Sequence, residues 1–247
     1  MVSSRPDNSA EATRPAPVVA ASQFVERYFP RCLFAVLAGS TAQGTASSRS
    51  DLDIVVIAPD EEPRWATYVE YGWPVELFVL TPAMYHDAFA KNVQRRRPLL
   101  PVLCAEGIVL VDRDGMGQHV QTEARRLLDA GPPPLGEDEA AEYRYTLTWM
   151  RDDLTDESDP DEVRLIAHDL AMMAAQCYLV YHRHWIGRGK WLLRELRKAN
   201  PDRARDFTQA LNMFAWHGQK EPLLTFADAV LALLGGPRFD GQMDPWH

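Results

Sequence analysis

Residues 39–53 read GSTAQGTASSRSDLD, and they join two short apolar segments at positions 33–38 and 52–57. Residues 33–38 are a continuous apolar run and residues 52–57 are rich in β-branched side chains, so both segments predict buried β-strands. Residues two positions apart on a strand point to the same face. Asp51 and Asp53 therefore place two carboxylates on one face where the second strand begins.

These two carboxylates predict a binding site for a hard divalent cation. Mg²⁺ is bound in proteins by one or two carboxylates together with the phosphates of a substrate. Gly39 and Ser40 come directly after the first strand. Glycine lets the backbone approach a phosphate closely, and the serine hydroxyl and neighbouring N–H groups can donate hydrogen bonds to it. The pattern predicts a joint site for magnesium and a nucleotide triphosphate.

A third carboxylate, Glu76, interrupts the apolar run 75–79. An unpaired charge in such a strand is costly, so a metal ion or a role in proton transfer would explain it. Each feature has a simpler alternative when taken alone. The aspartates could be a turn cap and a surface acid, Gly39-Ser40 a plain turn, and Glu76 an edge-strand acid facing water. Their combination favours a single functional site.

The remaining sequence predicts the domain organisation. Further strands are expected at 75–80 and 107–112, with a helix around 119–128, and GPPPLG at 131–136 is typical of a linker. Every long segment after the linker has helical spacing. We therefore predict an α+β protein. A flexible tail (1–18) precedes a small mixed β-sheet domain with flanking helices (19–130), and an all-α helical bundle domain follows (131–247).

Composition excludes several classes of protein. The chain is 46% hydrophobic and 25% charged, as in ordinary soluble domains. No apolar run approaches the roughly 18 residues of a membrane span, and the first residues lack the apolar core of a secretory signal. Cys32, Cys104 and Cys177 are far apart and odd in number, which argues against a disulfide framework or a zinc site. We expect a cytoplasmic protein with no membrane partner.

The acidic charge is concentrated in one stretch. Between Glu137 and Glu162, 11 acidic residues stand against Arg144 and Arg151, which gives 2 − 11 = −9, the net charge of the whole chain. Such a surface repels nucleic acid and suits a cationic or small-molecule partner, so no DNA partner is expected. A solvated helix face is the simpler alternative.

The succession of Gly39-Ser40, a loop, Asp51-Leu52-Asp53 and Glu76 one strand later resembles the signature of the nucleotidyltransferase superfamily with a polymerase-β-like core. In layout, the helical half resembles the antibiotic (aminoglycoside) nucleotidyltransferases. The resemblance implies transfer of a nucleoside monophosphate, AMP from ATP, to a hydroxyl with release of pyrophosphate. The implied acceptor is a small, hydroxylated and cationic molecule. A protein or tRNA target, as in toxin–antitoxin systems, and an inactive nucleotide-binding module are the alternatives.

The resemblance also implies residue roles in the first half. Gly39 and Ser40 would hold the β- and γ-phosphates, and Asp51 and Asp53 would bind two magnesium ions. Glu76 would be either a third metal ligand or the general base. Family members often carry a basic residue near the position of Gln43, so Arg49, together with Ser50, is predicted to contact the nucleotide instead.

Two residues of the helical half are further candidates. Lys190 follows a glycine-rich turn at the expected start of a helix, and it resembles a phosphate-contacting lysine of the streptomycin enzymes. A solvated lysine is the alternative, and Arg188 is its competitor. Asp169 lies in a mainly apolar helix and is predicted to bind the acceptor, unless it pairs with an arginine. Related antibiotic enzymes imply a monomer or a homodimer.

Overall fold

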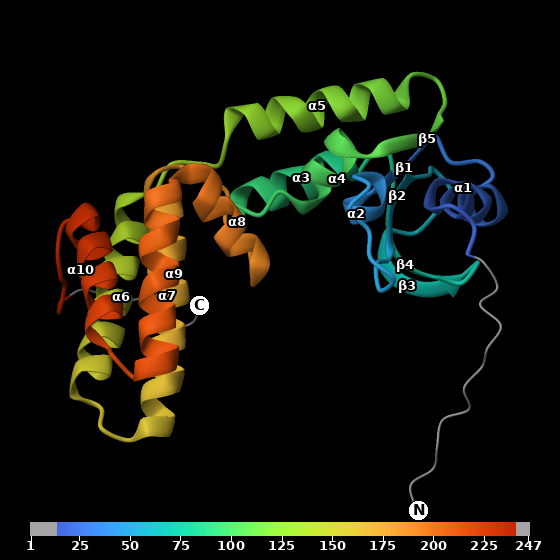
Figure 1. Ribbon diagram of the computed structural model, residues 1–247. Helices are drawn as coiled ribbons and strands as arrows, with labels where there is room; N and C mark the ends of the chain where they lie inside the picture. The colour runs from blue at the N-terminus through green and yellow to red at the C-terminus, as the bar shows by residue number, and fades with distance from the viewer. Residues whose placement is uncertain (1–13, 241–247) are drawn as a thin grey trace, which may run out of the picture. The chain divides into compact units, whose positions relative to one another are not determined.

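The computed structural model describes residues 14–240, which divide between Ala130 and Gly131 into two compact units (Figure 1). Five strands and five helices make up the described part of the first unit. In chain order they are α1 (Pro17–Tyr28), β1 (Phe34–Ala38), α2 (Gly39–Ala42), β2 (Leu52–Ile57), β3 (Arg64–Glu70), β4 (Trp73–Leu80), α3 (Tyr85–Gln94), α4 (Leu99–Glu106), β5 (Ile108–Asp112) and α5 (Met116–Ala130).

The five strands form one mixed sheet in the order β3-β4-β2-β1-β5. β2 and β4 are parallel, whereas the β1–β2, β1–β5 and β3–β4 pairs are antiparallel. Because β2 and β4 are parallel, both strands begin at the same end of the sheet. All residues of β1 are buried, as expected for a central strand covered on both faces.

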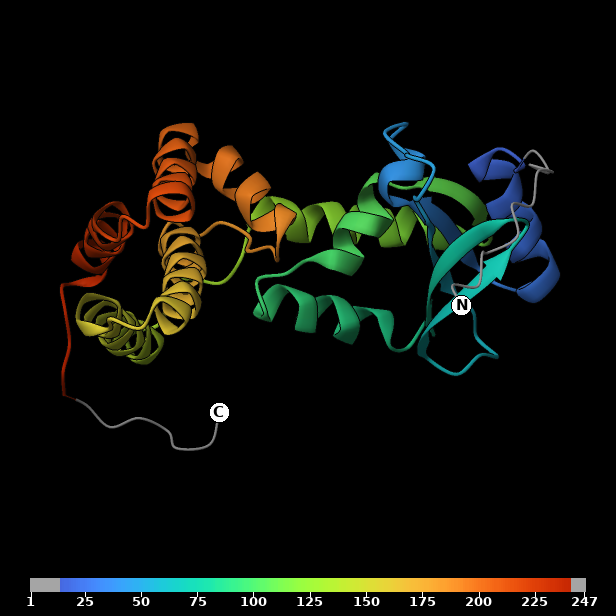
Figure 2. The same ribbon diagram turned by 60° about the horizontal axis from the view of Figure 1, so that its bottom comes forward.

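Alternation along the strands produces two apolar faces. On one face, Ala35, Leu37 and Ile54 pack against Phe24 and other residues of α1. The opposite face packs against α3, α4 and α5 through a second cluster that includes Phe34, Val36, Val55, Phe89 and Val120. Figure 2 shows α1 on one side of the sheet and these three helices on the other. The sheet is therefore the middle layer of three.

Strand β3 was not predicted from the sequence. Residues 64–70 form β3, and Tyr71 and Gly72 are the two-residue connection of a β-hairpin in which Glu70 pairs with Trp73. Tyr71 and Gly72 both have positive φ angles, 52° and 76°, as a two-residue type I′ hairpin turn requires. β3 is an edge strand with mostly exposed side chains, so it lacks the apolar alternation that reveals a half-buried strand.

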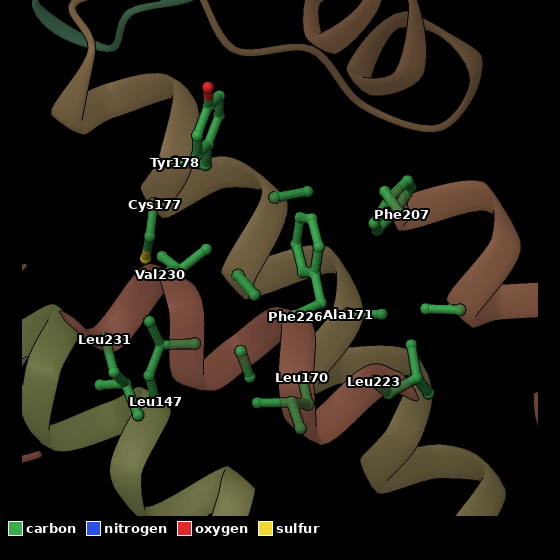
Figure 3. Close-up of a cluster of buried hydrophobic side chains, with 14 of the residues drawn as sticks. Leu147, Leu170, Ala171, Cys177, Tyr178, Phe207, Leu223, Phe226, Val230 and Leu231 are labelled. Atoms are coloured by element: carbon green, nitrogen blue, oxygen red, sulfur yellow. The ribbon is translucent and has the colours of Figure 1, made fainter. Parts of the chain in front are cut away.

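The second unit is a bundle of helices, which confirms the predicted α+β fold class. The helices are α6 (Glu137–Asp156), α7 (Pro160–Tyr181), α8 (Lys190–Ala199), α9 (Pro201–His217) and α10 (Glu221–Leu234). The side chains of Asp159 and Asn200 cap the N-termini of α7 and α9, and each is followed by a proline at the first helical position. Leu147, Leu170, Phe207 and Phe226 from four of the helices meet in the core (Figure 3).

Within residues 14–240, α7 is the one helix long and apolar enough to cross a membrane by length and composition. Its most apolar window is 56% buried inside the folded chain. Leu170, Ala174 and Cys177 of this helix are completely buried in the helical core. The apolar character of α7 is therefore explained by its packing against the neighbouring helices.

Candidate active site

Parallel pairing of β2 and β4 brings three acidic side chains together. Asp53 on β2 is the register partner of Glu76 on β4, and Asp51 lies two residues before Asp53. Carboxylate oxygens of the three residues all lie within 4.8 Å of one another. Asp53 and Glu76 are half-buried near the starts of these two strands. The three carboxylates that the sequence singled out therefore form one cluster.

The electrostatics of this cluster favour a bound cation. Burial, the charge of Asp51 and a hydrogen bond with Glu76 raise the pKa of Asp53 to about 7. Without a cation, the folded protein thus holds a proton among these carboxylates well above the usual range for an aspartic acid. A divalent cation would offset the same repulsion, and an all-oxygen set of carboxylates is what Mg²⁺ prefers. The donor set fits the metal that the family resemblance implies.

Stability should therefore depend on pH in the metal-free protein. The ordinary pKa of 3.8 applies to Asp53 in the unfolded chain, and the folded value is about 7. The folded state binds the proton of Asp53 more tightly than the unfolded chain does. Protonation of Asp53 therefore stabilises the fold fully below pH 3.8, and this stabilisation is lost as the pH rises through about 7. We expect the midpoint of thermal unfolding in EDTA to fall over this window, relative to the same series in Mg²⁺. Parallel curves in the two buffers would contradict the expectation.

Gly39 lies against the cluster in a conformation suited to glycine. It follows β1 with a φ angle of +70°, in the left-handed region that other residues rarely adopt. A Cβ atom built at Gly39 would lie 1.8 Å from Oδ2 of Asp53, which is far closer than any real contact. The missing side chain therefore makes room for the carboxylate of Asp53, in addition to leaving the backbone accessible.

Serine hydroxyls organise the loop between Gly39 and Asp51. The hydroxyl of Ser40 donates to Oγ of Ser50 at 3.1 Å, and the backbone N–H of Ser47 donates to the same Oγ at 2.8 Å. Ser50 thus closes the loop and lies next to Ser40. Arg49 is exposed, and its backbone N–H donates to Oγ of Ser47 at 3.3 Å. The side chain of Gln43 donates to Glu106 at 3.1 Å.

Thr41, which the sequence pattern does not single out, supports the same segment. Residues 39–42 form the single helical turn α2 directly after β1. Thr41 is buried, and its hydroxyl donates to the carbonyl of Ala38 at 3.2 Å. This bond fixes α2 onto the end of the strand and thereby positions Gly39. A buried threonine leaves no signal in a loop sequence that is rich in small polar residues.

Two predicted residues belong to the second unit. Lys190 is the first residue of α8, follows Gly189, and is exposed. Asp169 lies on α7 with its side chain exposed, and among residues 14–240 it makes no ion pair. The alternative of Asp169 as the partner of an arginine thus finds no support in the described structure. Contacts of Lys190 and Asp169 with substrates stay predictions.

Part of the acidic stretch has structural roles. Asp159 accepts hydrogen bonds from the backbone N–H groups of Asp161 and Glu162, and these bonds lower the pKa of its carboxyl. Glu157 accepts from the N–H groups of Ser158 and Asp159 at 2.7 Å each, with the same effect on its pKa. Acidic residues also occupy the first turns of α6 and α7, where their negative charge interacts favourably with the positive end of the helix dipole. Charge in this stretch serves helix capping as well as the surface potential.

Comparison with known proteins assigns the first unit to a family. Residues 20–101 match the nucleotidyltransferase domain family, and this range includes Gly39, Ser40, Asp51, Asp53 and Glu76. None of the curated proteins matches the chain. A solved nucleotidyltransferase-like protein from Exiguobacterium sibiricum is similar at 11% sequence identity and a TM-score of 0.49, over 88% of this chain and 74% of that one. Residues 20–101 are therefore a nucleotidyltransferase domain, and the chain is a nucleotidyltransferase enzyme.

Proposed function

We propose that this enzyme transfers AMP from ATP to a hydroxyl of a small, cationic, aminoglycoside-like acceptor in a magnesium-dependent reaction that releases pyrophosphate. The observation that carries this proposal is the cluster of Asp51, Asp53 and Glu76, whose oxygens lie within 4.8 Å of one another beside Gly39. It lies in the segment that matches the nucleotidyltransferase domain.

Asp51 and Asp53 would hold magnesium in this proposal, with the triphosphate completing its coordination. When bound, the metal supplies positive charge that neutralises the phosphates and favours the ionised form of the attacking hydroxyl. Glu76 is the proposed general base, because its carboxylate is half-buried beside Asp53 and can accept the proton of the acceptor hydroxyl. Near-normal turnover of Glu76→Gln would contradict that role and leave Glu76 as a metal ligand at most.

The nucleotide phosphates would lie along residues 39–50. Gly39 leaves the backbone open at the end of β1, and the hydroxyls of Ser40 and Ser50 are adjacent there. Arg49 is exposed in the same loop and can add positive charge. Lys190 of the second unit is proposed as a further cation for the triphosphate, because it is exposed at the start of α8 after a glycine turn.

A cationic acceptor is supported by the charge of the second unit. Eleven acidic residues against two arginines between Glu137 and Glu162 give this part of the chain a strongly negative potential. Asp169 lies exposed on α7 without an ion pair in the described part of the chain, so its carboxylate is available to an amino group. A hydroxylated, aminoglycoside-like acceptor matches this chemistry better than nucleic acid does.

A panel assay for pyrophosphate release tests the proposal. Each nucleoside triphosphate is combined with Mg²⁺ and with cationic aminoglycosides, neutral hydroxylated metabolites, or tRNA. We expect release with ATP and a cationic acceptor, and its loss in EDTA. Release with tRNA alone would overturn the acceptor class and leave nucleotidyl transfer in place. Magnesium-independent ATP binding without any release would favour an inactive binding module.

A further inference from the structure

A second group of ligand-type side chains lies on the helical layer of the first unit. His86 is on α3, and His119 and Glu123 are on α5. Both helices pack on the same face of the sheet (Figure 1). One nitrogen from each histidine and one oxygen from Glu123 all lie within 4.8 Å of one another. Residues of the catalytic cluster take no part in this group.

The backbone brings these three side chains together before any ion binds. His119 and Glu123 are four residues apart on one helix, so they lie one above the other on the same face. Nδ1 of His86 lies 2.8 Å from the carboxylate of Glu123 across the two helices. The rings of His86 and His119 meet edge to face with centroids 6.2 Å apart. The two histidine nitrogens and the carboxylate oxygen are already close, so small side-chain movements would bring all three to one ion.

Glu123 is also held from behind by a buried tyrosine. Tyr85 is 2% exposed, and its hydroxyl donates to Glu123 Oε2 at 3.2 Å. Carboxylates that bind metals are commonly oriented by such outer hydrogen bonds. Tyr85 thus has the position expected of a residue that supports a metal ligand.

We propose that His86, His119 and Glu123 bind a zinc ion that joins α3 to α5. Two imidazoles and one carboxylate suit Zn²⁺, whereas Mg²⁺ favours oxygen ligands. The imidazole of His86 is 51% exposed, so a fourth coordination position is open to solvent. The spacing His119-x-x-x-Glu123 is visible in the sequence, but its partner His86 lies 33 residues earlier. Only the packing of α3 and α5 on one sheet face brings it into reach.

Titration of the metal-stripped, tag-free enzyme with Zn²⁺ alone, in competition with a chromogenic chelator, tests this site. We expect one saturable site in the wild type. His119→Gln should weaken it by at least about a hundredfold, because loss of an outer-shell partner alone costs about 10- to 100-fold. Tyr85→Phe should weaken it by about tenfold for that reason. His217→Ala removes an exposed histidine at the end of α9 and should leave zinc binding unchanged.

Cobalt substitution separates this site from the catalytic carboxylates. Co²⁺ with two imidazole ligands in a tetrahedral site absorbs strongly in the visible range, and an all-carboxylate site does not. We expect this absorption in Asp51→Asn/Asp53→Asn and its loss in His119→Gln, while His119→Gln retains magnesium-dependent nucleotidyl transfer. Zinc affinity equal in His119→Gln and the wild type would overturn the proposal, as would the absence of saturable zinc binding in the wild type.

Discussion

Replacing Asp53 by asparagine is expected to reduce nucleotidyl transfer by about a thousandfold while making the metal-free protein more stable at neutral pH. A metal ion supplies several kcal/mol of stabilisation to the charges of the transition state, and about 4 kcal/mol corresponds to a factor of about a thousand. The stability gain has a separate cause. Asp53 is crowded by Asp51 and Glu76 at a half-buried position, and an amide of the same shape removes that repulsion.

Two measurements check the Asp53→Asn prediction. Single-turnover kinetics with saturating ATP report the chemical step, and thermal unfolding in EDTA at neutral pH reports stability. Asp129→Asn is a matched control, because Asp129 is an exposed aspartate on α5 of the same unit. It should change neither quantity. Retained activity in Asp53→Asn would contradict a metal role for this residue, and lowered stability would contradict carboxylate repulsion in the folded state.

Replacing Gly39 by alanine is expected to reduce transfer by about a hundredfold and to destabilise the fold by about 1–2 kcal/mol. The stability loss follows from the φ angle of +70°, since a left-handed conformation costs an L-residue about that much. Loss of activity follows from the new Cβ, which would lie 1.8 Å from Oδ2 of Asp53. The carboxylate must move by more than 1 Å, and a displacement of that size can cost about a hundredfold in rate.

Gly115→Ala separates the two effects of Gly39→Ala. Gly115 has a φ angle of +72°, and an added Cβ there would meet nothing within 4 Å. The variant should therefore lose similar stability in urea unfolding and retain full activity. Equal activity of Gly39→Ala and Gly115→Ala would show that the close approach to Asp53 has no catalytic consequence.

Most of the fold is readable from the sequence, for identifiable reasons. Strands β1 and β2 are short apolar runs, and the helices of the second unit repeat apolar residues with helical spacing. A linker was predicted at residues 131–136, and the described chain divides into two compact units after Ala130. β3 was missed because an exposed edge strand has no buried face to impose a pattern on its side chains.

The candidate site was only partly readable. Asp51 and Asp53 share a strand face, so their proximity follows from local geometry alone. Glu76 is 23 residues further along the chain, and only the parallel β2–β4 register places it opposite Asp53. Residue spacing does not reveal whether two strands run parallel or antiparallel. The resemblance to a known family supplied what spacing could not.

The sequence by itself determined the residue types of the site, the order of the strands other than β3, the helical character of the second half, and the family resemblance. These features depend on side-chain chemistry and on short-range periodicity, which a linear chain displays directly. Tertiary structure alone decided that Asp53 lies against Gly39, that its pKa is raised to about 7, and that His86 meets His119 and Glu123. Each depends on burial and on atoms brought together from distant parts of the chain, because solvent exclusion and close contact exist only after the layers have packed.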